Sequence, residues 1–490
     1  MKRSACIGAV EARRHYYARR DAAGATRNMN RIDHESAKAA PDVGTRALLR
    51  LAGPIFVAQL AVMGLAVIDT IMAGRLSATD LAAVSVGSNI YVSVYIAFMG
   101  ILQALTPIAG HHYGAGRYRE IGADLIQAFW LIVFLTIIGV GLLTWHEPWL
   151  KLAHASPEVA AKASRYLDAV AFGLPASLGT RVFNAMNSAV SRPKVTMSIQ
   201  IVALLSKVPL NLLFMYGFDL GGPGCGVASA VIAYTTFFLS LAVWRLDPGF
   251  ARYRSHGSRR IDWARQRELL RLGLPSGGSL LIEVTSFTFM AIFIARLGAE
   301  TLASHQIVAN LISVLFMLPM ALGVATGVLV AQSLGAGAPL TARSAAYRGF
   351  RTAAFGGACG VLLLWLLRDA VVDAYTTNPD VAKIALRLLA VACVFHAFDV
   401  FQGVAGFVLR GYKVATLPMV IHGVSLWGIG LGGGYLLAFV YPPAWTQDAA
   451  SGAFSFWLAA TVGLAVTAFG LSALALRIAN QYVREAKPAA

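Results

Sequence analysis

Three carboxylates, Asp69, Glu283 and Asp399, occur within long apolar stretches of this chain. An ionised side chain near the centre of a bilayer costs about 2.5 kcal/mol or more, so such groups are rare and mark ion or substrate pathways. Removal from water favours the neutral, protonated carboxyl group, whereas neighbouring carbonyl and hydroxyl oxygens could help a carboxylate hold sodium. We therefore interpret the three residues as cation-coupling sites of a transporter, with a proton or a sodium ion as the coupling ion.

Apolar helices must position these groups. The 490 residues are 57% hydrophobic and 13% charged, with a mean hydropathy of +0.64, which indicates a membrane protein. A helix needs about 20 apolar residues to cross a bilayer. Continuous apolar runs, unlike the alternating ten-residue segments of a barrel, predict an all-α polytopic protein. We expect twelve spans, near residues 52–75, 84–108, 125–144, 164–190, 195–217, 224–244, 270–296, 307–334, 350–367, 388–409, 414–439 and 454–476.

The formal charge of +17 is explained by where the basic residues fall. Most of the 41 Lys and Arg residues lie in loops and tails that are cytoplasmic if both termini are inside, as the positive-inside rule requires. This distribution favours a lipid bilayer as the partner of the basic surface, and we expect no nucleic acid. The basic stretch between residues 245 and 268 reads as a solvated linker beside anionic headgroups.

The chain repeats itself at an offset of 221 residues. The matching segments are Leu49-Arg50-Leu51 with Leu270-Arg271-Leu272, Arg75-Leu76 with Arg296-Leu297, and Gly114-Ala115-Gly116 with Gly335-Ala336-Gly337. Each half has six predicted spans, an even number, so the repeat is parallel. We predict a cytoplasmic tail (1–46), an N-terminal lobe (47–244), the basic linker (245–268), a C-terminal lobe (269–478) and a second cytoplasmic tail (479–490). The glycine-rich run at 428–434 is either a bending point or a site of close helix packing.

Three motifs resemble those of one family. Asp69-Thr70-Ile71-Met72-Ala73-Gly74, Glu283-Val284-Thr285, and Asp399 followed by Leu409-Arg410-Gly411-Tyr412-Lys413 are similar to segments of the multidrug and toxic compound extrusion (MATE) transporters, NorM-type branch. The resemblance covers about residues 45–480 and implies a V-shaped, twelve-helix antiporter. Such a protein exports bulky, often cationic compounds while protons or sodium ions enter.

From this resemblance we expect a monomer in the bacterial inner membrane, with drugs or toxic organic cations as partners and no cofactor. The alternative is a flippase for a lipid-linked saccharide of the same superfamily, which would need a cationic cleft for phosphate. We expect no enzymatic activity, because the chain lacks the HExxH, G-x-S-x-G and GxxxxGK motifs.

Glu283 and Asp399 lie near the middle of their spans, about 13 and 11 residues from the span ends, so both could face one cavity. The resemblance implies that a cation and the drug occupy this site alternately, with sodium as one candidate at Glu283 and Asp399. Thr285 or Ser286 could add oxygens. Phe395 stands where NorM-type proteins often carry tyrosine, which removes a hydroxyl. Other candidates for the substrate cleft are listed by position as Gln59, Met63 and Phe287.

Asp69 and Asn211 are predicted at similar depth in the N-terminal lobe. Lys207, four residues before Asn211, replaces an asparagine that is typical of the family. It lies about 20 Å from one membrane surface and about 15 Å from the other, too deep to reach water readily, so it needs a carboxylate and Asp69 is the candidate. The ammonium would then occupy the place of a bound cation. A static ion pair and a neutral lysine are the alternatives.

Four further polar residues lie within predicted spans. Arg181 is expected to form a structural ion pair rather than to contact substrate. His305, His396 and His422 are isolated in the sequence, and we interpret them as helix-interface residues rather than as a proton relay.

Overall fold

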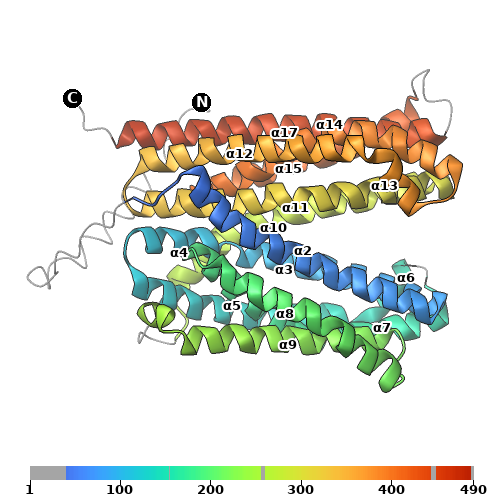
Figure 1. Ribbon diagram of the computed structural model, residues 1–490, viewed down its shortest axis with the longest axis horizontal. Helices are drawn as coiled ribbons and strands as arrows, with labels where there is room; N and C mark the ends of the chain where they lie inside the picture. The colour runs from blue at the N-terminus through green and yellow to red at the C-terminus, as the bar shows by residue number, and fades with distance from the viewer. Residues whose placement is uncertain (1–39, 154, 255–259, 443–448, 487–490) are drawn as a thin grey trace, which may run out of the picture. The chain divides into compact units, whose positions relative to one another are not determined.

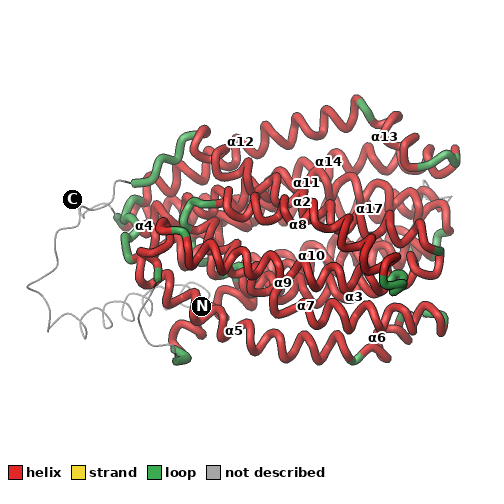
Figure 2. The backbone as a smooth tube through the Cα atoms, turned by 60° about the horizontal axis from the view of Figure 1, so that its bottom comes forward, coloured by secondary structure: helices red, strands yellow, loops and turns green. Residues whose placement is uncertain are grey.

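The computed structural model describes residues 40–153, 155–254, 260–442 and 449–486. These residues are helical and contain no β-strand (Figure 2). The predicted tail at 1–46 and the tail at 479–490 lie largely or partly outside the described residues.

The first half of the chain forms α2 (Thr45–Leu76), α3 (Ala78–Leu102), α4 (Leu105–Gly114), α5 (Tyr118–Thr144), α6 (His146–Leu152), α7 (Pro157–Ala189), α8 (Pro193–Asn211), the π-helix η1 (Leu212–Gly217) and α9 (Pro223–Leu246). A 3₁₀ turn, η2 (Pro248–Tyr253), begins the linker. Several helices begin at favourable caps: Ser77 Oγ, for example, accepts a hydrogen bond from Asp80 N at 2.9 Å at the start of α3.

The second half forms α10 (Trp263–Ala295), α11 (Ala299–Gly335), α12 (Pro339–Leu366), α13 (Arg368–Tyr375), α14 (Pro379–Gly411), α15 (Thr416–His422), the π-helix η3 (Gly423–Gly432), α16 (Gly433–Tyr435), η4 (Leu436–Val440) and α17 (Ala449–Glu485). In Figure 1 most helices of the first half, in blue to green, lie below those of the second half, in yellow to red.

Eleven helices in the described part of the chain are long and apolar enough to cross a membrane. They account for all predicted spans except 164–190, which corresponds to α7. This helix has 33 residues but is less apolar than the others, because it carries polar groups such as Asp168, Arg181 and Asn187. The prediction of twelve comparable apolar spans is therefore corrected to eleven plus one more polar helix of similar length.

The repeat seen in the sequence has a structural counterpart. Both Gly-Ala-Gly segments end a helix, and their last glycines have nearly the same left-handed backbone angle, with φ of 71° at Gly116 and 70° at Gly337. Gly114 lies against the main chain of Gln332, and Gly335 lies against the main chain of His111. The partners in these two contacts are again 221 residues apart. The contact is therefore reciprocal, as expected around a two-fold axis between the lobes.

The first helix of each half crosses into the other half. Leu48, Ala52 and Ile55 of α2 share a hydrophobic cluster with α11, whereas Leu269 and Leu272 of α10 share one with helices of the first half. These contacts lie near the Gly-Ala-Gly turns. At the opposite end, the cluster around Met290, Ile294 and Trp457 contains only residues of the second half. The lobes therefore share apolar packing chiefly at the linker end of the molecule.

The glycine-rich run at 428–434 lies mostly in the π-helix η3. Gly463 of α17 approaches the main chain of η3 so closely that a Cβ would meet Ser425 O at 2.5 Å. Close packing, one of the two predicted roles, is therefore present in this region.

Candidate functional site

The carboxylates of the C-terminal lobe meet at one amide. Gln402, on the same face of α14 as Asp399, donates from Nε2 to Asp399 Oδ1 and to Glu283 Oε1 of α10, each at 3.4 Å. Asp399 is buried, and Glu283 is half-buried. The two acidic groups predicted to share one site are thus linked through a neutral side chain that the sequence analysis did not single out.

The amide also contacts a histidine from a third helix. Gln402 Oε1 lies 3.0 Å from His422 Nε2, and His422 Nδ1 lies 2.8 Å from the main-chain oxygen of Pro418. His422 is the last residue of α15, directly before the π-helix η3. The prediction that this histidine is isolated is wrong, because α15 brings it to Gln402.

The hydrogen-bond geometry limits how protons can be placed in this network. The Pro418 oxygen only accepts, so His422 Nδ1 carries a hydrogen. If Gln402 Oε1 faces His422, then Nε2 must also carry a hydrogen and the imidazole is charged. If the amide is turned over, its oxygen faces the carboxyl groups, and one of them must donate a hydrogen. In both arrangements the network holds a dissociable proton.

The other two histidines are fully buried. His396 Nδ1 lies 3.5 Å from Asp399 Oδ2, yet neither ring nitrogen of His396 has a hydrogen-bond partner within the described residues. His305 lies beside Trp457, with 5.8 Å between ring centroids. His396 is therefore a neighbour of the acidic cluster, whereas His305 packs as the sequence analysis expected of an interface residue.

Phe395, one of the candidate cleft residues, is buried, with 3% of its surface exposed. Its ring meets Phe287 and Trp457 edge-on, at centroid distances of 5.7 and 5.6 Å. Gln59 and Met63, one turn apart on α2, and Phe287 are half-buried. Phe395 is thus part of an aromatic cluster behind the carboxylates, and a substrate-contacting role for the four residues stays a prediction.

Thr285 and Ser286 use their hydroxyl groups elsewhere. Thr285 Oγ1 donates to the main-chain oxygen of Leu281 at 2.5 Å, and Ser286 Oγ donates to that of Leu426 at 3.4 Å. No group of three or more His, Cys, Asp or Glu side chains is placed to hold a metal ion in the part of the chain that the structure describes. Sodium at Glu283 and Asp399 stays a prediction.

The N-terminal lobe has a different arrangement. Lys207 Nζ of α8 lies 2.8 Å from Asp69 Oδ1 of α2, and the lysine side chain is 1% exposed. Asn211 Nδ2 donates to the same carboxylate oxygen at 2.8 Å. The structure thus brings together the three residues that the sequence analysis grouped by depth.

Two groups of α9 complete this ion pair. Lys207 Nζ donates to Ser229 Oγ at 2.6 Å and to the main-chain oxygen of Cys225 at 3.4 Å, so all three ammonium hydrogens have acceptors. The Ser229 hydroxyl in turn lies 3.5 Å from Asp69 Oδ2. Ser229 carried no signal in the sequence, because a serine in an apolar helix more often bonds to its own main chain.

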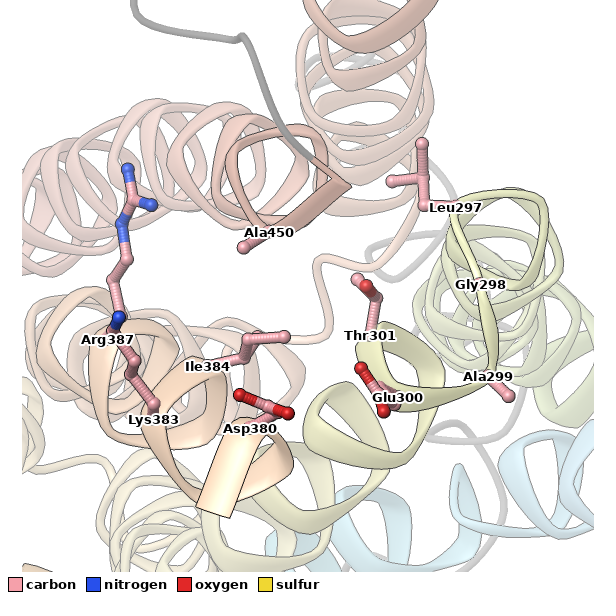
Figure 3. Close-up of a pocket in the computed structure, with 10 residues that line it drawn as sticks. All are labelled: Leu297, Gly298, Ala299, Glu300, Thr301, Asp380, Lys383, Ile384, Arg387 and Ala450. Atoms are coloured by element: carbon pink, nitrogen blue, oxygen red, sulfur yellow. The ribbon is translucent and has the colours of Figure 1, made fainter. Parts of the chain in front are cut away.

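A separate pocket of about 630 Å³ lies at the ends of α11, α14 and α17 (Figure 3). Its lining includes Glu300 and Asp380, in the first turns of α11 and α14, and the basic side chains of Lys383 and Arg387. The pocket shares no residue with either carboxylate cluster. Acidic residues in a first helical turn are explained by the helix dipole, so we assign the pocket no part in ion coupling.

Comparisons with known proteins agree with this arrangement. The MatE family model matches residues 54–213 and 275–436, once in each half. A protein of Aromatoleum aromaticum named probable multidrug resistance protein NorM is 40% identical over 435 residues, covering 86% of this chain and 92% of the relative. Multidrug resistance protein MdtK of Pectobacterium atrosepticum is 35% identical over 431 residues, covering 86% and 93%.

Solved structures show the same fold at lower sequence identity. The crystal structure of the eukaryotic MATE transporter AtDTX14 has a TM-score of 0.80 at 20% identity and covers 90% of this chain and 99% of its own. An outward-facing MATE transporter of the MOP superfamily has a TM-score of 0.81 at 16% identity, covering 91% and 98%. With two matches to the family model and relatives of up to 40% identity over most of its length, this multi-pass membrane protein belongs to the MatE family, in the part related to NorM.

Proposed function

We propose that this protein is a secondary active multidrug exporter, which moves bulky, often cationic compounds in exchange for protons or sodium ions. The names of its relatives support multidrug export, and no enzymatic step or cofactor is needed for it. The observation that carries the coupling role is the Glu283–Gln402–Asp399 cluster. Two carboxylates held by one neutral amide form a site that a proton, a metal cation or a cationic compound would neutralise.

Alternating access would be provided by motion of one lobe against the other. The packing of α2 on α11 and of α10 on α3 supports this proposal, because these contacts join the lobes at the linker end. At the other end, the core around Trp457 is built by one lobe alone. An exchange of this packing between the two ends would open the space between the lobes to the opposite side of the membrane.

The N-terminal lobe would contribute through Asp69, Lys207 and Asn211. With Lys207 in place, its ammonium occupies the position at Asp69 that a bound cation would take. Coupling would then depend on Glu283 and Asp399 alone, or it would require protonation of Asp69 and release of Lys207.

We place the protein in the bacterial inner membrane as a monomer, with both termini in the cytoplasm. The bacterial relatives support the location, and the basic linker supports the orientation. The predicted lobes and linker would keep the boundaries given above, although the first helix of each lobe also packs into the other.

Uptake of a fluorescent cationic dye into everted membrane vesicles tests the function. Dye accumulation is compared under a proton gradient and under a sodium gradient, for the wild type, Asp399→Asn and Glu283→Gln. The matched control is Glu300→Gln, which removes a carboxylate from the same lobe at a pocket remote from the cluster.

The proposal predicts gradient-driven uptake that is lost in Asp399→Asn and Glu283→Gln and kept in Glu300→Gln. The gradient that drives uptake identifies the coupling ion. Uptake without any gradient dependence, or full activity in both cluster variants, would contradict the proposal. The first of these results would favour the flippase alternative.

A further inference from the structure

Two arginines from different lobes lie near each other at the junction of the lobes. Arg181 belongs to α7 in the N-terminal lobe, and Arg410 to the last turn of α14 in the C-terminal lobe. Their charges are close enough to interact. Both side chains are half-buried, so each retains some accessible surface within the protein. The predicted ion pair of Arg181 is absent from the described residues, where neither arginine has a carboxylate oxygen within 4.0 Å.

Arg410 is held in place by neutral groups. Its Nη1 donates to Gln103 Oε1 of the N-terminal lobe at 3.0 Å, and its guanidinium carbon lies 4.8 Å from the centroid of the Phe407 ring. A guanidinium has five N–H donors in a planar fork. Gln103 and Phe407 therefore fix the orientation of Arg410 while most of its donors stay without an acceptor from a side chain.

Arg181 has fewer contacts still. Its Nε is buried and has no hydrogen-bond partner. One helical turn further along α7, Asn184 Oδ1 is also buried without a partner. Polar groups that are left unsatisfied in a protein interior are costly, and unpartnered groups of this kind are commonly satisfied by a water molecule, an ion or a ligand.

The electrostatic balance points in the same direction. Two like charges that face each other away from bulk water repel, and burial makes each one more costly. Glu283 is the carboxylate whose charge interacts with Arg410, but it is already shared with Gln402 and Asp399. A planar guanidinium fork matches two oxygens of a carboxylate or a phosphate.

We propose that Arg181 and Arg410 form a binding site for an oxyanion, the carboxylate or phosphate group of a small molecule or of a lipid. For transported cargo, the arrangement selects amphoteric molecules, with the cationic part toward Glu283 and Asp399 and the acidic part between the arginines. This inference goes beyond the proposed function, and binding measurements test it without any need for transport.

Rhodamine B and its ethyl ester are suitable probes, because both are cationic dyes and only rhodamine B has a free carboxylate. Their binding to the purified full-length protein in neutral detergent is measured by fluorescence anisotropy. Arg181→Gln and Arg410→Gln should each weaken rhodamine B about tenfold, since a charge-assisted hydrogen bond is lost, and should leave the ester unchanged. Arg343→Gln is the control: this arginine of α12 donates to Asn480, and its loss should change neither dye.

Two further measurements distinguish the source of the oxyanion and guard against misfolding. If lipid phosphate fills the site, phosphatidylglycerol should displace rhodamine B and raise the thermal unfolding temperature of the wild type but not of the double variant Arg181→Gln/Arg410→Gln. If cargo fills it, phosphatidylglycerol should do neither. If the glutamine variants do not fold, Arg181→Lys and Arg410→Lys keep the charge without the fork and should still weaken rhodamine B selectively. Equal losses for both dyes, or no loss for either, would overturn the proposal.

Discussion

The acidic sites of the two lobes solve the same electrostatic problem in opposite ways. In the N-terminal lobe a single carboxylate, Asp69, is neutralised by a buried lysine. In the C-terminal lobe two carboxylates are held by the neutral side chain of Gln402. At an offset of 221 residues, Asp69 corresponds to Met290, Glu283 to Val62 and Asp399 to Leu178, so neither site is a copy of the other. The repeat supplies a shared scaffold, and single residues give each lobe its own chemistry.

The largest difference between the lobes should appear in stability. Lys207→Met leaves Asp69 buried without its counter-charge, and removal of one partner from a buried ion pair costs about 3–5 kcal/mol. We expect a strong fall in thermal unfolding temperature in detergent, which the double variant Lys207→Met/Asp69→Asn should largely restore. A single variant as stable as the wild type would mean that the pair does not act as a buried unit.

Neutralisation in the C-terminal lobe should have the opposite balance of effects. Asp399→Asn removes repulsion between like charges, so stability should stay unchanged or rise, whereas gradient-driven dye uptake should fall about tenfold or more. Unfolding temperature and vesicle uptake are measured on the same preparation. A destabilised Asp399→Asn protein would indicate that this carboxylate has a structural role like that of Asp69.

Gln402→Met tests the amide that links the two carboxylates. The methionine has a similar shape but cannot bridge Glu283, Asp399 and His422, so we expect a few-fold loss of uptake and a shift in its pH dependence. His422→Phe should reproduce part of this effect. The two substitutions combined should be less than additive, because they interrupt one network. Fully additive losses would separate His422 from the coupling cluster.

The smallest expected effect concerns the hydroxyl group that supports Lys207. Ser229→Ala removes one acceptor from the ammonium, and we expect a loss of about 1 kcal/mol in the free energy of unfolding. Ser240→Ala is a matched control on the same helix, because Ser240 Oγ donates only to the main-chain oxygen of Thr236. Equal losses in both variants would show that Ser229 contributes nothing specific to the ion pair.

The sequence predicts the elements better than their contacts. Apolar runs and the internal repeat predict the spans, and helical rise predicts that Lys207 meets Asp69, since both residues lie at known depths in neighbouring helices. Gln402 could have been suspected from its spacing of three residues after Asp399. His422 could not, because its position depends on how α15 packs against α14, and the crossing of α2 and α10 into the opposite lobes is likewise a tertiary effect.

The paired contact between the two Gly-Ala-Gly turns has a consequence for how this gene can change. Each of Gly114 and Gly335 faces the main chain of the other half, where a methyl group would collide with the backbone. A shift that made room in one copy would move the surface against which the other copy is fitted. At this point the two halves are bound to a common history: elsewhere they can drift apart freely, but here a change in one must be answered in the other.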